Sequence, residues 1–174
     1  MTKTKQLTFT ALCVALGIVL PMTLHAVPSG GSIFLPMHIP VLLCGLICGW
    51  PFGLLCGLAT PFLSSLLTGM PPMAYLPSML CELAVYGLVA GLILKFVRTK
   101  STIVDLYIAL VGAMLAGRFA AGVLNALIFN VGKYSMEIWV TGMFVKALPG
   151  IIIQLVLLPV VVQALMKAKV VTRG

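Results

Sequence analysis

Two uncharged apolar runs, residues 39–48 and 52–67, follow each other with only Gly49-Trp50-Pro51 between them. Because Pro51 cannot continue a helical hydrogen-bond ladder, we expect two short helices packed as a tight hairpin. Small residues on one helix face let two backbones approach closely, and glycine recurs here at every fourth position, at Gly45, Gly49, Gly53 and Gly57. The alternative is a single helix that kinks at Pro51.

The composition of the chain assigns these runs to a membrane. Of the 174 residues, 61% are hydrophobic and 8% are charged, whereas a typical soluble domain has about 25% charged residues. So few charges cannot coat a water-soluble globule, and the sequence therefore predicts an integral membrane protein. The net charge of +8 comes from basic residues at the ends of apolar runs, where they set orientation rather than bind nucleic acid.

The apolar runs predict an all-α protein with six transmembrane helices in one domain, residues 1–174. A spanning helix needs about 20 residues, and the expected spans are 7–27, 39–49, 52–68, 76–95, 106–131 and 138–166. Residues 33–37 are expected to form a short extended or interfacial piece. The last span contains Pro149 and Pro159, so it should kink or begin as a shorter outer piece.

Basic clusters predict the orientation of these spans. The clusters are Lys3 and Lys5, then Lys95, Arg98 and Lys100, then Lys167, Lys169 and Arg173. Cytoplasmic loops carry an excess of Lys and Arg, so both termini and the loop after the fourth span should be cytoplasmic. Six spans fit this arrangement, whereas five would put the termini on opposite sides.

Three charged residues, Glu82, Arg118 and Lys146, are expected within spans. A charge at mid-bilayer costs at least about 2.5–3.5 kcal/mol, so such residues usually face a protein interior or water and mark function. At about 1.5 Å per residue, Glu82, Asn125 and Lys146 lie at one level in the outer half of the membrane. We therefore predict an outward-opening polar pocket whose candidate residues are Glu82, Tyr86, Arg118, Asn125, Lys146, Gln154, His38 and Trp139.

The same charges have a structural alternative, in which Glu82 forms an interhelical ion pair with Arg118 or Lys146. The glycines around Arg118 are equally compatible with a packing joint between helices. If the pocket reading holds, Lys146 or Arg118 could receive a carboxylate or phosphate, which favours a ligand with both donors and an anionic group. His25 and His38 border the connection after the first span, where each is either a ligand contact or simply solvated.

Sequence motifs of catalysis and metal binding are absent. The chain contains no Walker-type loop, GxSxG or HExxH pattern, and its five cysteines lie in apolar runs without His or carboxylate at ligand spacing. We therefore expect no enzymatic activity, no cofactor and no metal. Two alternatives stay open, a proton-coupled solo carrier in which Glu82 titrates and, less favoured, a small membrane enzyme that uses Glu82 as acid or base.

Several of these features together resemble a known family. They are Leu35-Pro-Met-His-Ile-Pro-Val41, the Gly45 to Gly57 spacing, residues 60–72 (TPFLSSLLTGMPP), Glu82 with Tyr86-Gly87, and Gly117-Arg118. The sequence resembles the substrate-binding S components of energy-coupling factor (ECF) vitamin transporters, in the branch that includes carriers for pantothenate, hydroxymethylpyrimidine, folate and cobalamin-type compounds. The resemblance does not identify the vitamin.

The resemblance implies a multi-pass protein of a prokaryotic plasma membrane with six helices and an outward-facing site built from the last three helices and the outer loops. It also implies three partners, namely a transmembrane scaffold (T) subunit and two cytoplasmic ATPases, and an S component that topples in the membrane to release its vitamin. Ala11 and Ala15 match the small-residue pattern of the first helix that contacts the scaffold. Packing of these two alanines within the chain is the alternative from spacing alone.

Overall fold

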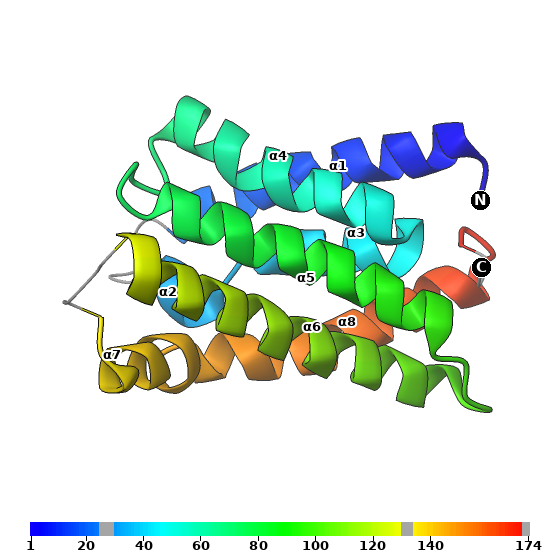
Figure 1. The fold of residues 1–174 in the computed structure, drawn as a ribbon. Coiled ribbons are helices and arrows are strands. Elements are labelled where there is room, and N and C mark those ends of the chain that lie inside the picture. The colour runs from blue at the N-terminus through cyan, green and yellow to red at the C-terminus, as the bar shows by residue number, and fades with distance from the viewer. Residues whose placement is uncertain (25–29, 130–133, 172–174) are drawn as a thin grey trace.

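A computed structural model describes residues 1–24, 30–129 and 134–171, and every regular element within these ranges is a helix. Six helices of the described chain are long and apolar enough to cross a membrane, which confirms the predicted all-α, six-span class. The elements are α1 (Lys3–Thr23), α2 (Gly30–Phe34), α3 (His38–Cys48), α4 (Trp50–Thr68), α5 (Leu76–Phe96), α6 (Thr102–Leu124), η1 (Asn125–Phe129), α7 (Met136–Val140), η2 (Thr141–Val145) and α8 (Leu148–Lys167). They form one bundle (Figure 1).

The first two spans differ in detail from their expected bounds. Helix α1 begins at Lys3 because the hydroxyl of Thr2 accepts a hydrogen bond from the Lys5 backbone N–H and caps it. Residues 30–34 are helical rather than extended, and the second span of Gly30–Cys48 is broken near Leu35, whose φ is 51°. His25 and the end of the expected first span lie outside the described residues.

The predicted hairpin forms between α3 and α4, which contact each other on either side of Gly49. Gly49 has a φ of 86°, a conformation that glycine adopts without steric cost. Pro51 then lies in the first turn of α4, where its missing N–H would have no intrahelical partner in any case. The chain therefore breaks into two helices instead of kinking as one.

The repeated glycines bring three helices together, not two. A Cβ added at Gly53 would overlap the carbonyl oxygen of Gly87 on α5, and one added at Gly87 would overlap the carbonyl oxygen of Gly53. Gly45 on α3 and Gly57 on α4 also lie against the α5 backbone. We call this set, Gly45, Gly53, Gly57 and Gly87, the glycine junction, and it fixes α3, α4 and α5 at backbone contact.

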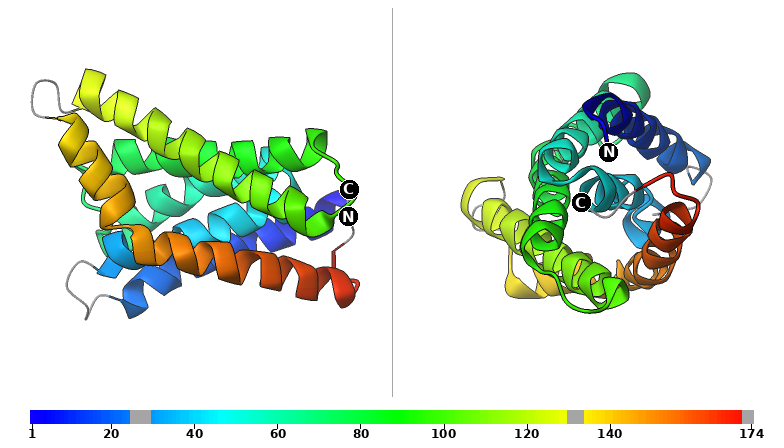
Figure 2. Two further views of the ribbon diagram at one scale, coloured as in Figure 1. Left: turned by 90° about the horizontal axis from the view of Figure 1, so that it is seen from below. Right: turned by 90° about the vertical axis from the view of Figure 1, so that its right-hand side faces the viewer.

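The last third of the chain begins with a separate outer piece. Helix α6 continues into the π-helical turn η1 at Asn125, and α7 with η2 then precedes α8 at an angle to it (Figure 2). Pro149 lies in the first turn of α8, so the last span starts at Leu148. Lys146 consequently lies before this span and not within it, because the break falls earlier than the expected helix.

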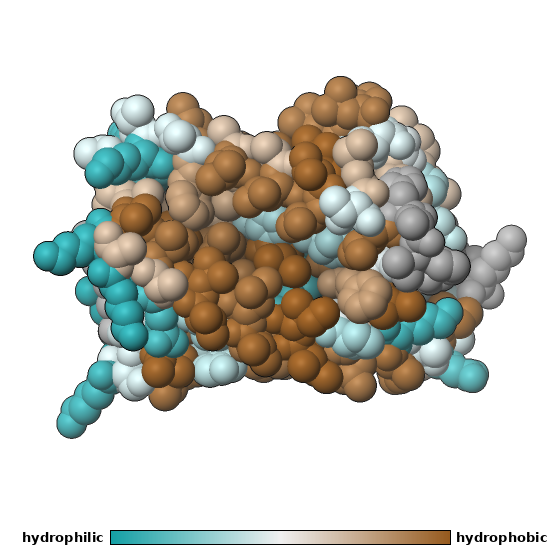
Figure 3. Space-filling view, turned by 180° about the vertical axis from the view of Figure 1, so that it is seen from behind, coloured by the Kyte–Doolittle hydropathy of each residue, from teal (hydrophilic) through white to brown (hydrophobic). Residues whose placement is uncertain are grey.

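The two ends of the bundle differ in composition. The start of α1, the end of α8, the α3–α4 turn and the α5–α6 connection lie at the same end (Figures 1 and 2). There Met1, Trp50, Lys95, Arg98 and Val171 are among the residues that line a hollow of about 250 Å³. On the face seen in Figure 3, hydrophobic side chains cover most of the middle and hydrophilic side chains gather at this end. We call it the basic end, after Lys3, Lys5, Lys95, Arg98, Lys100, Lys167 and Lys169, and call the opposite end the pocket end.

Candidate functional site

A cavity of about 640 Å³ opens at the pocket end, which is within the range of small-molecule binding sites. Six parts of the chain line it: the end of α1, α2 with the start of α3, the loop before α5, the first turns of α5, the end of α6 and the α7–η2 piece. Its described lining residues are Pro21, Leu24, Gly30, Gly31, Ser32, Leu35, Pro36, Met37, His38, Met70, Pro71, Pro72, Tyr75, Ser78, Met79, Glu82, Arg118, Asn125, Tyr134, Ile138, Gly142, Met143 and Ala147. The cavity thus draws on α1 to α3 as well as on α5, α6 and the outer pieces, whereas none of its described lining residues belongs to α8.

Four buried polar side chains from three helices meet at the bottom of this cavity. His38 begins α3, Glu82 and Tyr86 lie one turn apart on α5, and Arg118 comes from α6. Their exposed fractions are between 0 and 7%. His38 Nε2 lies 3.5 Å from Glu82 Oε1, and the rings of His38 and Tyr86 meet edge to face at 5.3 Å.

Arg118 is held by groups from two other elements. Its Nε donates to the hydroxyl of Tyr86 at 2.7 Å, and one terminal nitrogen donates to the backbone carbonyl of Met143. The guanidinium also lies 5.3 Å from the centre of the Phe144 ring, a distance at which a cation is attracted to the face of an aromatic ring. Arg118 therefore connects α6 to α5 and to η2.

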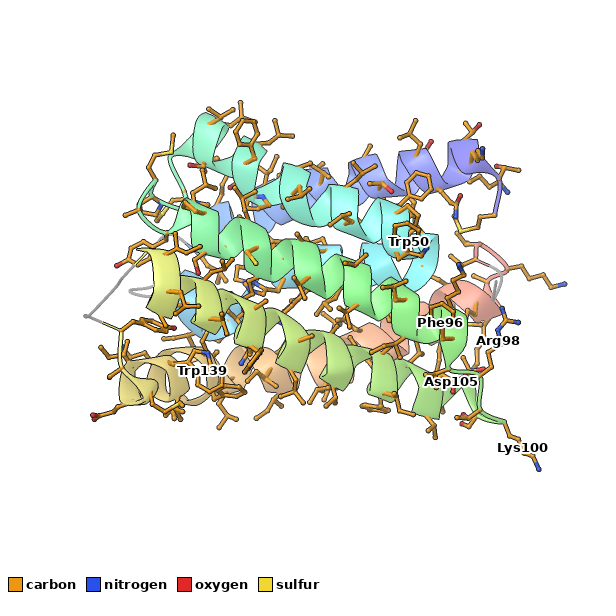
Figure 4. All side chains as sticks on the ribbon, in the orientation of Figure 1. Trp50, Phe96, Arg98, Lys100, Asp105 and Trp139 are labelled. Carbon is orange, nitrogen blue, oxygen red and sulfur yellow. The ribbon has the colours of Figure 1, made fainter. Side chains whose placement is uncertain are left out.

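Small residues beside Arg118 make room for this connection. A Cβ at Gly117 would overlap the ring of Tyr86, and one at Gly122 would overlap the indole of Trp139. Trp139 reaches from α7 to α6 (Figure 4) and donates from Nε1 to the carbonyl of Arg118 at 3.1 Å. We call Tyr86, Arg118, Trp139 and the Met143 carbonyl the polar junction. The predicted packing joint and the predicted pocket thus share Arg118.

Asn125 adds another polar side chain to the cavity wall. It lies where α6 becomes π-helical, and its Nδ2 donates to the hydroxyl of Ser78 at 2.5 Å and to the carbonyl of Ala121 at 2.8 Å. Tyr134 lies on the same wall, and partial burial together with the nearby charge of Glu82 raises the pKa of its phenol. Asn125 and Glu82 therefore line one cavity from different helices.

Four of the predicted site residues do not line the cavity. Tyr86 is fully buried against His38 and Arg118. Lys146 is exposed and does not line the cavity. Trp139 does not line the cavity but hydrogen-bonds the backbone carbonyl of Arg118, which does. Gln154 is fully buried on α8, and neither its Nε2 nor its Oε1 has a hydrogen-bond partner within the described chain. In place of the alternative ion pair of Glu82 with Arg118 or Lys146, the structure has Glu82 near His38 and Arg118 bonded to Tyr86 and Met143.

Much of the cavity wall escaped the sequence analysis because it is apolar. Four methionines line it, Met37, Met70, Met79 and Met143, together with Tyr75. In a chain that is 61% hydrophobic, such residues carry no signal that separates a cavity wall from a lipid-facing surface. Ser78 was detectable in principle, since it lies one turn before Glu82.

The described residues contain no group of three His, Cys, Asp or Glu side chains that could hold a metal ion. The arrangement instead suits the binding of an organic molecule between a polar floor and apolar walls.

Comparison with known proteins points the same way. A family model described as the substrate-specific component of ECF transporters matches residues 5–162, whereas no curated protein and no solved structure matches the chain. The matched residues run from the first turn of α1 into α8 and include the whole of the cavity described above. The chain therefore belongs to the family of ECF transporter substrate-specific components.

Proposed function

We propose that this protein binds a water-soluble vitamin or vitamin precursor in the pocket-end cavity and delivers it across the membrane with a scaffold subunit and two ATPases. The observation that carries this proposal is the cavity of about 640 Å³ with buried His38, Glu82 and Arg118 at its floor. Family membership supports a small-molecule substrate and an energising partner module in general.

The distribution of charge supports an outward-facing cavity. The basic end carries Lys3, Lys95 and Lys167 with their neighbours, and excess Lys and Arg favour the cytoplasmic side of a membrane. With that end in the cytoplasm of a prokaryotic cell, the cavity opens outside the plasma membrane, where it can capture its substrate. Both termini are then cytoplasmic.

The outer face of α1 supports the proposed scaffold contact. Ala11 and Ala15 are exposed, whereas Thr10, Cys13 and Gly17 of the same helix face the bundle. The two alanines therefore do not pack within the chain, and they present a flat strip on which another helix can approach closely.

Native mass spectrometry of the chain purified in detergent from cells grown in rich medium tests the binding proposal. We expect one retained mass of vitamin size, lost in Glu82→Ala and kept in Glu137→Ala, whose carboxylate is exposed at the same end. A preparation of the wild-type chain that retains nothing and binds no vitamin in titration would contradict the proposal.

Coexpression with a scaffold subunit and ATPases tests the partner proposal. Ala11→Leu/Ala15→Leu should abolish copurification of the scaffold and leave substrate binding intact, because the added side chains block close helix approach. Ala164→Leu, at an exposed alanine of α8, is the matched control. Uptake by the chain alone in liposomes, driven by a pH gradient, would instead support the solo carrier.

A further inference from the structure

The cavity floor is not arranged to receive an anionic ligand. Among its described lining residues, the acidic and strongly basic side chains are Glu82 and Arg118, and Arg118 is 1% exposed. Its guanidinium already binds the Tyr86 hydroxyl and the Met143 carbonyl and lies against the Phe144 ring. A carboxylate or phosphate would have to displace these protein partners.

Lys146 does not offer a replacement cation, because it is exposed outside the cavity. An anion at the floor would also lie close to the Glu82 carboxylate in a region of low dielectric, where like charges repel strongly. The sequence-based expectation of an anionic ligand group therefore has no support in the tertiary structure.

The polar side chains of the cavity floor can still bind hydrogen-bond donors of a ligand. Glu82 lines the cavity, and an ionised carboxylate only accepts hydrogen bonds. Its approach to His38, at 3.5 Å, is longer than an ordinary hydrogen bond. Both ring nitrogens of His38 are buried without a hydrogen-bond partner in the described chain, and its ring is 3% exposed. Buried polar atoms rarely stay unpaired in native structures, and a ligand in the cavity that His38 lines can supply the partner.

The walls above this floor suit a flat ring. Met37, Met79 and Met143 line these walls, and thioethers make favourable contacts with aromatic rings. Tyr75 and Tyr134 add aromatic surface on the cavity wall, which can pack offset or edge to face against a second ring.

We propose that the cavity takes a planar, non-anionic ring compound that donates N–H groups to Glu82 and completes the hydrogen bonding of His38. The chemical class is a neutral or cationic nitrogen-bearing ring. This inference rests on the proposed role of the cavity as the substrate site, and it narrows that role to a class of substrate.

Three probes of nearly equal shape separate the possibilities: 2-naphthamidine is a cationic N–H donor, 2-naphthamide is a neutral one, and 2-naphthoate is an anion. Binding of each to the chain in lipid nanodiscs is measured by isothermal titration at up to millimolar concentration. We expect naphthamidine to bind at least about tenfold tighter than naphthoate, with naphthamide between them.

The variant Glu82→Gln preserves the shape of the side chain and removes its charge. In this variant we expect the ratio of naphthamidine to naphthoate affinity to fall by about tenfold or more. Glu137→Gln, which removes an exposed carboxylate at the same end, should keep the wild-type ratio. Circular dichroism and the melting temperature of each variant confirm that it is folded.

Tighter binding of naphthoate, an unchanged ratio in Glu82→Gln, or no binding of any probe would overturn this inference. None of these results contradicts the proposed transport role. That role is tested separately, by the uptake of labelled vitamins by cells that express the complete transporter. Conversely, wild-type probe preferences in a chain that supports no uptake would leave the ligand class intact and contradict the transport proposal.

Discussion

Tyr86 and Gly87 are neighbours in α5, yet they belong to two unlike helix junctions. Gly87 lies in the glycine junction, where the backbones of α4 and α5 touch without side chains between them. Tyr86 lies in the polar junction, where the hydroxyl, a guanidinium and a carbonyl connect α5, α6 and η2. The first junction depends on shape alone and the second on directional bonds that a ligand or a substitution can disturb.

This difference accounts for the position of the site. Close backbone contact makes α3, α4 and α5 one body, which carries His38 and Glu82 toward the cavity. Helix α6 packs along α5 through the apolar core, and the α7–η2 piece closes the other side of the cavity through the bonds of Trp139 and the Met143 carbonyl to Arg118. Most of the cavity wall is thus placed by close helix packing, and the α7–η2 wall is held mainly by a few polar contacts.

The largest effect is expected for Gly87→Ala. The added methyl group would overlap the backbone of Gly53, which cannot move without separating α4 from α5, so we expect a loss of about 3 kcal/mol or more of unfolding free energy. Unfolding in detergent, followed by circular dichroism, measures it. Gly31→Ala is the matched control because a Cβ there meets no atom within 4 Å. Equal stabilities of the two variants would show that the glycine junction is not close-packed.

A smaller loss is expected for Arg118→Met, which leaves the Tyr86 hydroxyl and the Met143 carbonyl without their partner. Buried groups without partners cost about 1–3 kcal/mol each. Adding Tyr86→Phe removes one of them, so the double variant should be less destabilised than the sum of the two single variants. Thermal unfolding of all four proteins gives this coupling, and strict additivity would contradict a direct bond between Arg118 and Tyr86.

Trp139→Phe should have a still smaller effect, of about 1 kcal/mol, because it removes one hydrogen bond and keeps most of the apolar contact. Limited proteolysis tests the two junctions separately. Release of α7 from α6 should make the α7 segment more susceptible to cleavage, while the glycine junction stays protected. Trp50→Phe, at the opposite end (Figure 4), serves as the control. Equal cleavage of the two variants would mean that Trp139 does not hold α7.

The smallest effect is expected for Lys146→Gln. Its side chain is exposed outside the cavity, and solvent and salt screen such a charge, so the dissociation constant of the retained substrate should change by less than about twofold. Competition binding in nanodiscs measures this change. A tenfold loss of substrate affinity would show that Lys146 contacts the substrate and would favour an anionic substrate.

Sequence reasoning succeeded where one residue or one period carries the signal. Glu82 and Arg118 were recognised because a charge in an apolar run is rare, and the break at Gly49-Trp50-Pro51 follows from backbone sterics. It failed for Lys146, because the expected last span merged α7, η2 and α8 into one helix. It also missed the carbonyl of Met143, since a backbone acceptor has no sequence signature.

The sequence by itself determined six apolar spans, their grouping of basic residues at one end and the presence of isolated buried charges, because these depend on composition and on local backbone rules. Only the tertiary structure decided that His38 approaches Glu82, that Arg118 binds Tyr86 and that Lys146 stays outside. Such pairings depend on how each helix is rotated and where it crosses its neighbours. Those variables are set by packing between residues that lie far apart in the chain.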